Sequence, residues 1–249
     1  MAIVLDDNDA LNNSCQLVNV VTWCVAAGIP NLTLYDHQGI LKQNLVTLKR
    51  ELEARRDFFF GSKKRYQYKF VDSPIQNVER HMKLNVNVNG IVDGLCGAPV
   101  DTSSVRICVT SAEDGQETII KILQKLALQI NNEKGLNDTL DLMEEGSPCQ
   151  NGKTDIINFK LLLDDNGNIQ KTKIHKLLEN TLSQVNGQYW PPPDFILKFG
   201  NPTVWTGFLP WHMRYSEILF TGCSLSNFNF GTFIKSLDKF NQCGRRFGK

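Results

Sequence analysis

The stretch LVNVVTWCVAAGIPNLTLYDHQG, residues Leu17–Gly39, contains the unit from which the rest of the fold can be predicted. Its first part places apolar residues at the i, i+3, i+4 spacing of a half-buried helix: Leu17, Val20, Val21, Cys24 and Val25. Gly28 and Pro30 are stop signals for this helix. Asn31–Tyr35 follows with leucines at alternate positions, which predicts a short strand. A helix that leads directly into a strand is typical of an α/β protein.

The same alternation continues after this unit. From Gly39 onwards we expect a second helix, with four leucines on its buried face: Leu41, Leu45, Leu48 and Leu52. Residues 105–109 alternate as another strand, and Ser111 with Asp114 fits a capping box at the start of the next helix. That helix would bury a stripe of apolar residues: Ile119, Ile120, Leu123, Leu126, Ala127 and Ile130.

The C-terminal part adds two strands and a helix. Phe195–Phe199 and Tyr215–Phe220 read as strands, and a last helix starts near Asn229. The expected buried residues of this helix are Phe230, Phe233, Ile234, Leu237 and Phe240. Strands that alternate with helices imply βαβ units. We therefore predict a single α/β domain over residues 1–249, with a central, mostly parallel sheet flanked by helices.

Two segments do not follow this alternation. Residues 57–103 and 132–170 lack a packing stripe, and we interpret both as variable loops or insertions. The first contains the basic cluster Lys63–Arg65. A short run of charge is more typical of a solvated loop than of a phosphate-binding surface.

Length and composition narrow the class of protein. With 249 residues, the chain can bury the core of one large domain. A net charge of +1 gives no overall field for nucleic acid, so we expect no such partner. The seven cysteines form no C-x-x-C pair and the four histidines have no zinc-ligand spacing, so we expect free thiols and no metal site in this chain. There is no run of about 18 apolar residues, so the chain as given should not span a membrane.

Four short motifs carry a resemblance to a known family. They are YDHQG at Tyr35–Gly39, DFILKFG at Asp194–Gly200, GFLPWHMRYSEILF at Gly207–Phe220 and the basic tail Arg245–Lys249. With these motifs the chain resembles the cis-prenyltransferases of the undecaprenyl diphosphate synthase superfamily. Among them, it is most similar to the Nogo-B-receptor-like subunits of the dehydrodolichyl diphosphate synthase complex. The resemblance implies a cis-prenyltransferase-like fold. It also implies an endoplasmic reticulum membrane location with the domain facing the cytosol, through an N-terminal anchor that this chain lacks.

The resemblance also implies that the former active site is degenerate. Catalytic members join isopentenyl diphosphate to an allylic diphosphate, which requires Mg²⁺ on a carboxylate, arginine forks and N–H groups at a helix start. The matching run here is Asp36, His37, Gln38, Gly39 and Ile40. The carboxylate remains, but Ile40 stands where the family has an arginine. A second set of phosphate ligands is replaced by Lys198, Val204 and Thr206. The Mg²⁺ is therefore expected on a catalytic partner and not on this chain.

Other matching residues correspond to the family's dimer interface: Phe208, Leu209, Trp211, Tyr215 and Glu217. Large aromatic residues suit a packed, obligate interface. The resemblance implies that Glu217 reaches toward the neighbouring subunit's site. Two alternatives stay open. Trp211 and Phe208 could serve only the core, and Asp36 and Glu217 could be remnants of the scaffold.

The last residues match the family's C-terminal R-x-G motif at Arg246, Phe247 and Gly248. The resemblance implies that this tail binds isopentenyl diphosphate in the partner's active site, where Arg246 supplies a phosphate fork and Gly248 lets backbone N–H groups face the anion. The alternative is a frayed basic tail.

Together these features predict an obligate accessory subunit of a heteromeric polyprenyl diphosphate synthase, a transferase that is inactive as the lone chain. Its partner would be a catalytic cis-prenyltransferase subunit, in a heterodimer or heterotetramer that serves dolichol synthesis and protein glycosylation. Two other readings remain: a receptor or scaffold without a synthase role, and a self-sufficient homodimeric synthase. Ile40 and Val204 disfavour the homodimer because it would need arginines at those positions.

Overall fold

The computed structural model describes ten parts of the chain: residues 1–61, 67–71, 104–115, 119–120, 123–124, 184–185, 188–200, 205, 207–208 and 212–244. The chain divides into two compact units. The first consists of Met1–Ser73, Gly97–Gln116 and Trp190–Lys249, and the second of Pro74–Cys96 and Glu117–Tyr189. The first unit contains the main sheet and every site discussed below. The expected single domain over residues 1–249 stays a prediction.

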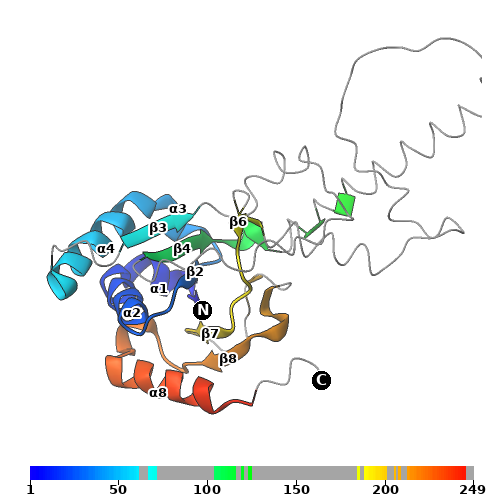
Figure 1. The fold of residues 1–249 in the computed structure, drawn as a ribbon. Coiled ribbons are helices and arrows are strands. Elements are labelled where there is room, and N and C mark those ends of the chain that lie inside the picture. Colours follow the sequence, from blue (N-terminus) through cyan, green and yellow to red (C-terminus); the bar gives the residue numbers. More distant parts are fainter. Residues whose placement is uncertain are drawn as a thin grey trace, which may run out of the picture. The chain divides into compact units, whose positions relative to one another are not determined.

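A six-stranded sheet forms the centre of the first unit, in the order β3-β4-β2-β1-β7-β8 (Figure 1). The strands are β1 (Ala2–Val4), β2 (Asn31–Tyr35), β3 (Gln67–Val71), β4 (Ser104–Thr110), β7 (Phe195–Lys198) and β8 (Glu217–Phe220). All five neighbouring pairs are parallel. The predicted mostly parallel α/β sheet is confirmed. In the second unit, β5 (Gln184–Val185) pairs with β6 (Gln188–Tyr189) in antiparallel fashion.

Helices cover the sheet and close its core. They are α1 (Asp7–Asn12), α2 (Ser14–Ala26), α3 (Ile40–Gln43), α4 (Leu45–Phe60) and α8 (Phe230–Gln242). Successive residues of a strand point to opposite faces of a sheet. In β1, Ile3 therefore joins the large core with buried residues of α2, α4 and α8, whereas Ala2 and Val4 join a smaller core with Phe208. Both faces of the sheet are thus buried, as parallel sheets require.

Several predicted elements have the expected bounds, and others are corrected. The strand Asn31–Tyr35 is confirmed residue for residue. The single helix expected after Gly39 is instead α3 and α4, because the Asn44 side-chain amide donates to the Ile40 carbonyl and ends the first helix. The last predicted strand begins at Glu217 rather than Tyr215, since His212–Tyr215 forms a 3₁₀ helix.

The prediction that residues 57–103 form a variable loop or insertion was wrong in part. Residues 57–103 contain the end of α4 and the edge strand β3, whose five residues are too few to show a clear period in the sequence. The insertion at 132–170 lies outside the described residues. The N-terminal strand β1 was not predicted at all, because three apolar residues before an acidic run carry little signal.

Two predicted buried stripes are also corrected. Ile120 and Leu123 are exposed, and so are Phe230 and Ile234 of α8. Burial of Phe233 is confirmed, and α8 also buries Ser236. In the part of the chain that the structure describes, no helix has the length and hydropathy needed to cross a membrane.

Candidate functional site

The candidate site lies at the carboxyl ends of the central strands. β1 has β2 on one side and β7 on the other, so the chain leaves β1 toward one half of the sheet and later returns to the opposite half. In open α/β sheets, ligands bind in the crevice beyond the carboxyl ends of the strands at such a switch point. Asp36 follows β2 here, Asp6 follows β1, and Lys198 ends β7.

Asp36 is fully buried and caps the short helix α3. Its Oδ2 accepts the Ile40 N–H at 2.6 Å and its Oδ1 accepts the Leu41 N–H at 3.1 Å. Gly39 makes this turn possible with a φ of 75°, which a residue with a side chain rarely adopts. Burial raises the pKa of the Asp36 carboxyl, although these backbone N–H groups act in the opposite direction. Both carboxylate oxygens are thus used inside the protein.

The rest of the Asp36–Ile40 run is held by the protein in the same way. The side chains of His37 and Gln38 are exposed. The His37 carbonyl accepts the Ala112 N–H at 3.3 Å, and the Gln38 N–H donates to Asp7 Oδ1 at 3.2 Å. The structure therefore gives this run the role of a turn between β2 and α3, fixed by bonds to neighbouring segments.

Lys198 is buried completely and is engaged in an ion pair. Its Nζ lies 2.6 Å from Asp6 Oδ1 and also donates to the Phe199 carbonyl. Gly200 leaves room for this pair, since a Cβ on Gly200 would lie 1.6 Å from Asp6 Oδ2. The positive charge of Lys198, which the sequence leaves available for a phosphate, is thus paired with the carboxylate of Asp6.

A second ion pair closes the β4 side of the site. Lys42 Nζ lies 2.5 Å from Asp114 and 2.7 Å from Glu113. Burial by itself would lower the pKa of Lys42, but the hydrogen bonds that its ammonium group donates to these two carboxylates outweigh burial and raise the pKa. The Ser111 N–H donates to Asp114 Oδ2 at 2.7 Å, so the predicted capping box is confirmed. Sequence reasoning missed both Lys42 and Asp6, because each pairs with a residue far away in the chain.

The carboxylates of this region accept hydrogen bonds from groups within the chain. Asp6 accepts from Lys198, Asp7 from Gln38, and Asp36 from two backbone N–H groups. Asp9 accepts the Leu225 N–H at 3.0 Å and the Asn13 amide. Among the residues that the structure describes, no group of three or more His, Cys, Asp or Glu side chains is placed to hold a metal ion. Each of these four carboxylates has at least one oxygen in a hydrogen bond within the chain.

The predicted interface residues fall into two groups. Phe208 is only 1% exposed and packs edge-to-face on Tyr35, with ring centres 5.1 Å apart. This places the Phe208 side chain in the core of the chain, and its contact with a partner stays a prediction. Tyr215, which precedes β8, and Glu217, the first residue of β8, are exposed, and β8 is at the edge of the sheet.

The remaining predicted residues cannot be placed in this way. Leu209, Trp211, Val204 and Thr206 lie outside the described residues, and so does the tail with Arg246, Phe247 and Gly248. The last described residues are Cys243 and Gly244, which follow α8.

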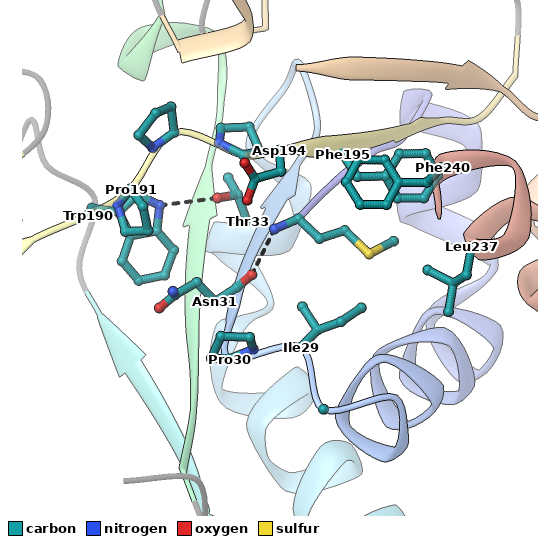
Figure 2. Close-up of a pocket in the computed structure, with 14 residues that line it drawn as sticks. Ile29, Pro30, Asn31, Thr33, Trp190, Pro191, Asp194, Phe195, Leu237 and Phe240 are labelled. Carbon is teal, nitrogen blue, oxygen red and sulfur yellow. Dashed lines mark hydrogen bonds between the residues drawn. The ribbon is translucent and has the colours of Figure 1, made fainter. Parts of the chain in front are cut away.

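A cavity of about 230 Å³ lies at the other end of the strands, near the amino ends of β1, β2 and β7. Figure 2 shows Ile29, Phe195, Leu237 and Phe240 among the residues that line it. The Trp190 indole N–H donates to Thr33 Oγ1 at 3.2 Å. Mostly apolar walls suit apolar ligand atoms better than acid–base chemistry.

Comparisons with known proteins agree with this fold. The family model for putative undecaprenyl diphosphate synthases matches residues 12–248. The chain is 26% identical to the dehydrodolichyl diphosphate synthase complex subunit NUS1 of Homo sapiens, over 100% of this chain and 66% of the relative. It is 27% identical to the subunit of the same name in Saccharomyces cerevisiae, over 92% of this chain and 52% of the relative. The chain thus spans between half and two thirds of the length of these relatives.

A comparison with solved structures also finds a similar fold. Lavandulyl diphosphate synthase from Lavandula x intermedia superposes with a TM-score of 0.51, covering 100% of this chain and 97% of that structure. The two sequences are 15% identical, so the similarity is one of fold.

Proposed function

Because the chain belongs to the family of putative undecaprenyl diphosphate synthases, we propose that it is a non-catalytic but required subunit of a heteromeric cis-prenyltransferase. The complex would be a dehydrodolichyl diphosphate synthase that makes long-chain polyprenyl diphosphate for dolichol synthesis and protein glycosylation. The names of its relatives, which are subunits of such a complex, support this proposal. In it, a catalytic partner binds Mg²⁺ and the allylic diphosphate, and the complex works at the endoplasmic reticulum membrane.

The observation that carries the non-catalytic role is the state of Asp36. Its two oxygens accept the N–H groups of Ile40 and Leu41. A catalytic site would offer the carboxylate to a metal ion and the N–H groups to a diphosphate. Lys198 is neutralised by Asp6, and an apolar side chain stands at Ile40. Each missing charged contact costs about 2–4 kcal/mol of transition-state stabilisation. The chain alone would therefore stabilise a leaving diphosphate too weakly for turnover.

In this proposal the chain contributes through its interface and its tail. Tyr215, which precedes the edge strand β8, and Glu217, the first residue of β8, are exposed, as a docking surface for the catalytic subunit requires. Arg246 and Gly248 would bind isopentenyl diphosphate in the partner's site, because a guanidinium forms a bidentate fork with phosphate and glycine lets backbone N–H groups turn toward an anion.

An assay of the purified chain tests the proposal. The lone chain, supplied with Mg²⁺, farnesyl diphosphate and labelled isopentenyl diphosphate, should form no polyprenyl product. Addition of a catalytic cis-prenyltransferase subunit should raise product formation well above that of the catalytic subunit alone. Turnover by the lone chain would favour the self-sufficient synthase. Association that leaves the partner's turnover unchanged would favour a receptor or scaffold.

A further inference from the structure

The cavity at the amino ends of the central strands lies away from the candidate site. Its volume is about 230 Å³, and its lining residues all belong to the first unit. Asn31, the first residue of β2, lines this cavity, whereas Asp36 follows the last residue of the same strand. The cavity and the turn at Asp36 are therefore at opposite ends of β2.

The walls of the cavity are mostly apolar and include two stacked rings. Phe240 of α8 stacks on Phe195 of β7, with ring centres 4.8 Å apart. Ile29 and Leu237 line the cavity as well (Figure 2). Asp194 is a lining residue too, but it is exposed, so solvent screens its charge. These walls suit an uncharged ring, because a charged ligand would lose its hydration among them.

Thr33 places a hydrogen-bond donor in this apolar wall. It is only 3% exposed, and its Oγ1 accepts the Trp190 indole N–H at 3.2 Å. A threonine hydroxyl can also donate one hydrogen bond. Within the part of the chain that the structure describes, the Thr33 hydroxyl hydrogen has no acceptor. A buried donor without a partner costs free energy, and an oxygen of a ligand in the cavity would remove that cost.

We propose that the cavity binds a small, uncharged aromatic compound with one hydrogen-bond acceptor, such as an aromatic alcohol. An engineered apolar cavity of about 150 Å³ holds benzene. A cavity of about 230 Å³ therefore has room for a ring with a short side chain. The ring would pack against Phe195 and Phe240, and its oxygen would accept the Thr33 hydroxyl. The inference does not depend on the proposed synthase role.

Titration of the full chain with 2-phenylethanol tests this site. The dissociation constant should lie below about 1 mM. The compound should shift the indole N–H resonance of Trp190, identified as the resonance that Trp190→Phe lacks, because this N–H group donates to Thr33. Phenylacetate has the same ring with a carboxylate in place of the alcohol. It should bind at least about tenfold more weakly, because its charge would be buried among apolar side chains.

A cavity-filling variant locates the bound compound. Leu237→Trp should abolish binding, because the larger side chain occupies the cavity. Ile234→Trp is the matched control, since Ile234 is in the same helix and 43% exposed, and it should bind like the parent chain. Thermal unfolding checks that both variants are folded. The proposal is overturned if the parent chain does not bind 2-phenylethanol or if Leu237→Trp binds it as well as Ile234→Trp.

Variants of Thr33 test the hydrogen bond. Thr33→Val should bind 2-phenylethanol about fivefold more weakly, because it lacks the hydroxyl. Its affinity for n-propylbenzene, which has a methyl group in place of the alcohol, should not change. Thr33→Ser keeps the hydroxyl and should bind both compounds like the parent chain. Equal affinity of the valine and serine variants for 2-phenylethanol would overturn the role of the hydroxyl and, with it, the proposed class of ligand.

Discussion

Asp36 illustrates how the neighbours of a side chain decide its role. A carboxylate after a central strand can hold a metal ion, but here its oxygens accept the N–H groups of Ile40 and Leu41 and start a helix. Lys198 is a parallel case, because its ammonium group is buried against Asp6 instead of facing a ligand. At both positions the residue type is compatible with catalysis, while its hydrogen-bond partners indicate a structural role.

Replacement of Asp36 tests this interpretation. Asp36→Ala should lower the free energy of unfolding by about 1–2 kcal/mol, because α3 loses its cap. Turnover of the assembled heteromer should change little, since the carboxylate serves no substrate. Denaturant unfolding and a turnover assay measure the two effects. Asp7→Ala is the control, because Asp7 accepts one exposed hydrogen bond, and it should destabilise less. Loss of turnover with unchanged stability would show that Asp36 is catalytic after all.

At the scale of elements, the segment before β8 contains one buried aromatic residue, Phe208, and one exposed aromatic residue, Tyr215. Phe208 packs under the sheet with Tyr35, Ala2 and Ile196. Tyr215, at the end of the 3₁₀ helix His212–Tyr215, is 49% exposed, with the Arg214 guanidinium 5.2 Å from the centre of its ring. Aromatic residues that look alike in the sequence are thus divided between the core and the surface.

Alanine variants should separate these two roles. Phe208→Ala should lower the free energy of unfolding by about 3–5 kcal/mol, the usual loss for a buried phenylalanine. Tyr215→Ala should barely change stability but weaken association with the catalytic subunit by about 2 kcal/mol if it is a hot spot. Thermal unfolding and titration calorimetry distinguish the effects. If Phe208→Ala weakens association without a loss of stability, Phe208 belongs to the interface.

At the scale of the whole molecule, ion pairs within the chain occupy the carboxyl ends of the strands at the switch point. The Asp6–Lys198 pair spans β1 and β7, and Lys42 joins Asp114 on the β4 side. In the proposed function, the chain contributes to catalysis through groups that it lends to a partner. The proposed contribution is therefore the tail Arg246–Gly248.

Variants of the tail test that contribution. Arg246→Ala should leave the heteromer assembled and lower its turnover by one to several orders of magnitude, as expected for about 2–4 kcal/mol of lost charge stabilisation. Gly248→Val should act in the same direction, because a β-branched residue resists the φ > 0 conformation. Arg245→Ala is the matched control and should have a smaller effect. Size-exclusion chromatography confirms assembly, and steady-state kinetics measure turnover. Full activity of the Arg246 and Gly248 variants would refute the role of the tail.

The sequence by itself determined the alternation of strands and helices, the strand Asn31–Tyr35 and the capping box at Ser111. These features depend on residues a few positions apart, whose side-chain period and caps are local properties. The sequence also indicated the missing arginine at Ile40, because a side chain without charge cannot form a phosphate fork in any fold.

Only the tertiary structure decided which groups meet. Lys198 and Asp6 are 192 positions apart, and no local pattern pairs them. The three residues of β1 become a central strand because β2 and β7 supply hydrogen bonds on both sides. Burial of Phe208 and exposure of Phe230 and Ile234 likewise depend on the elements packed against them. Distant contacts form only when the chain closes on itself, so the free energy that fixes them is a property of the packed molecule.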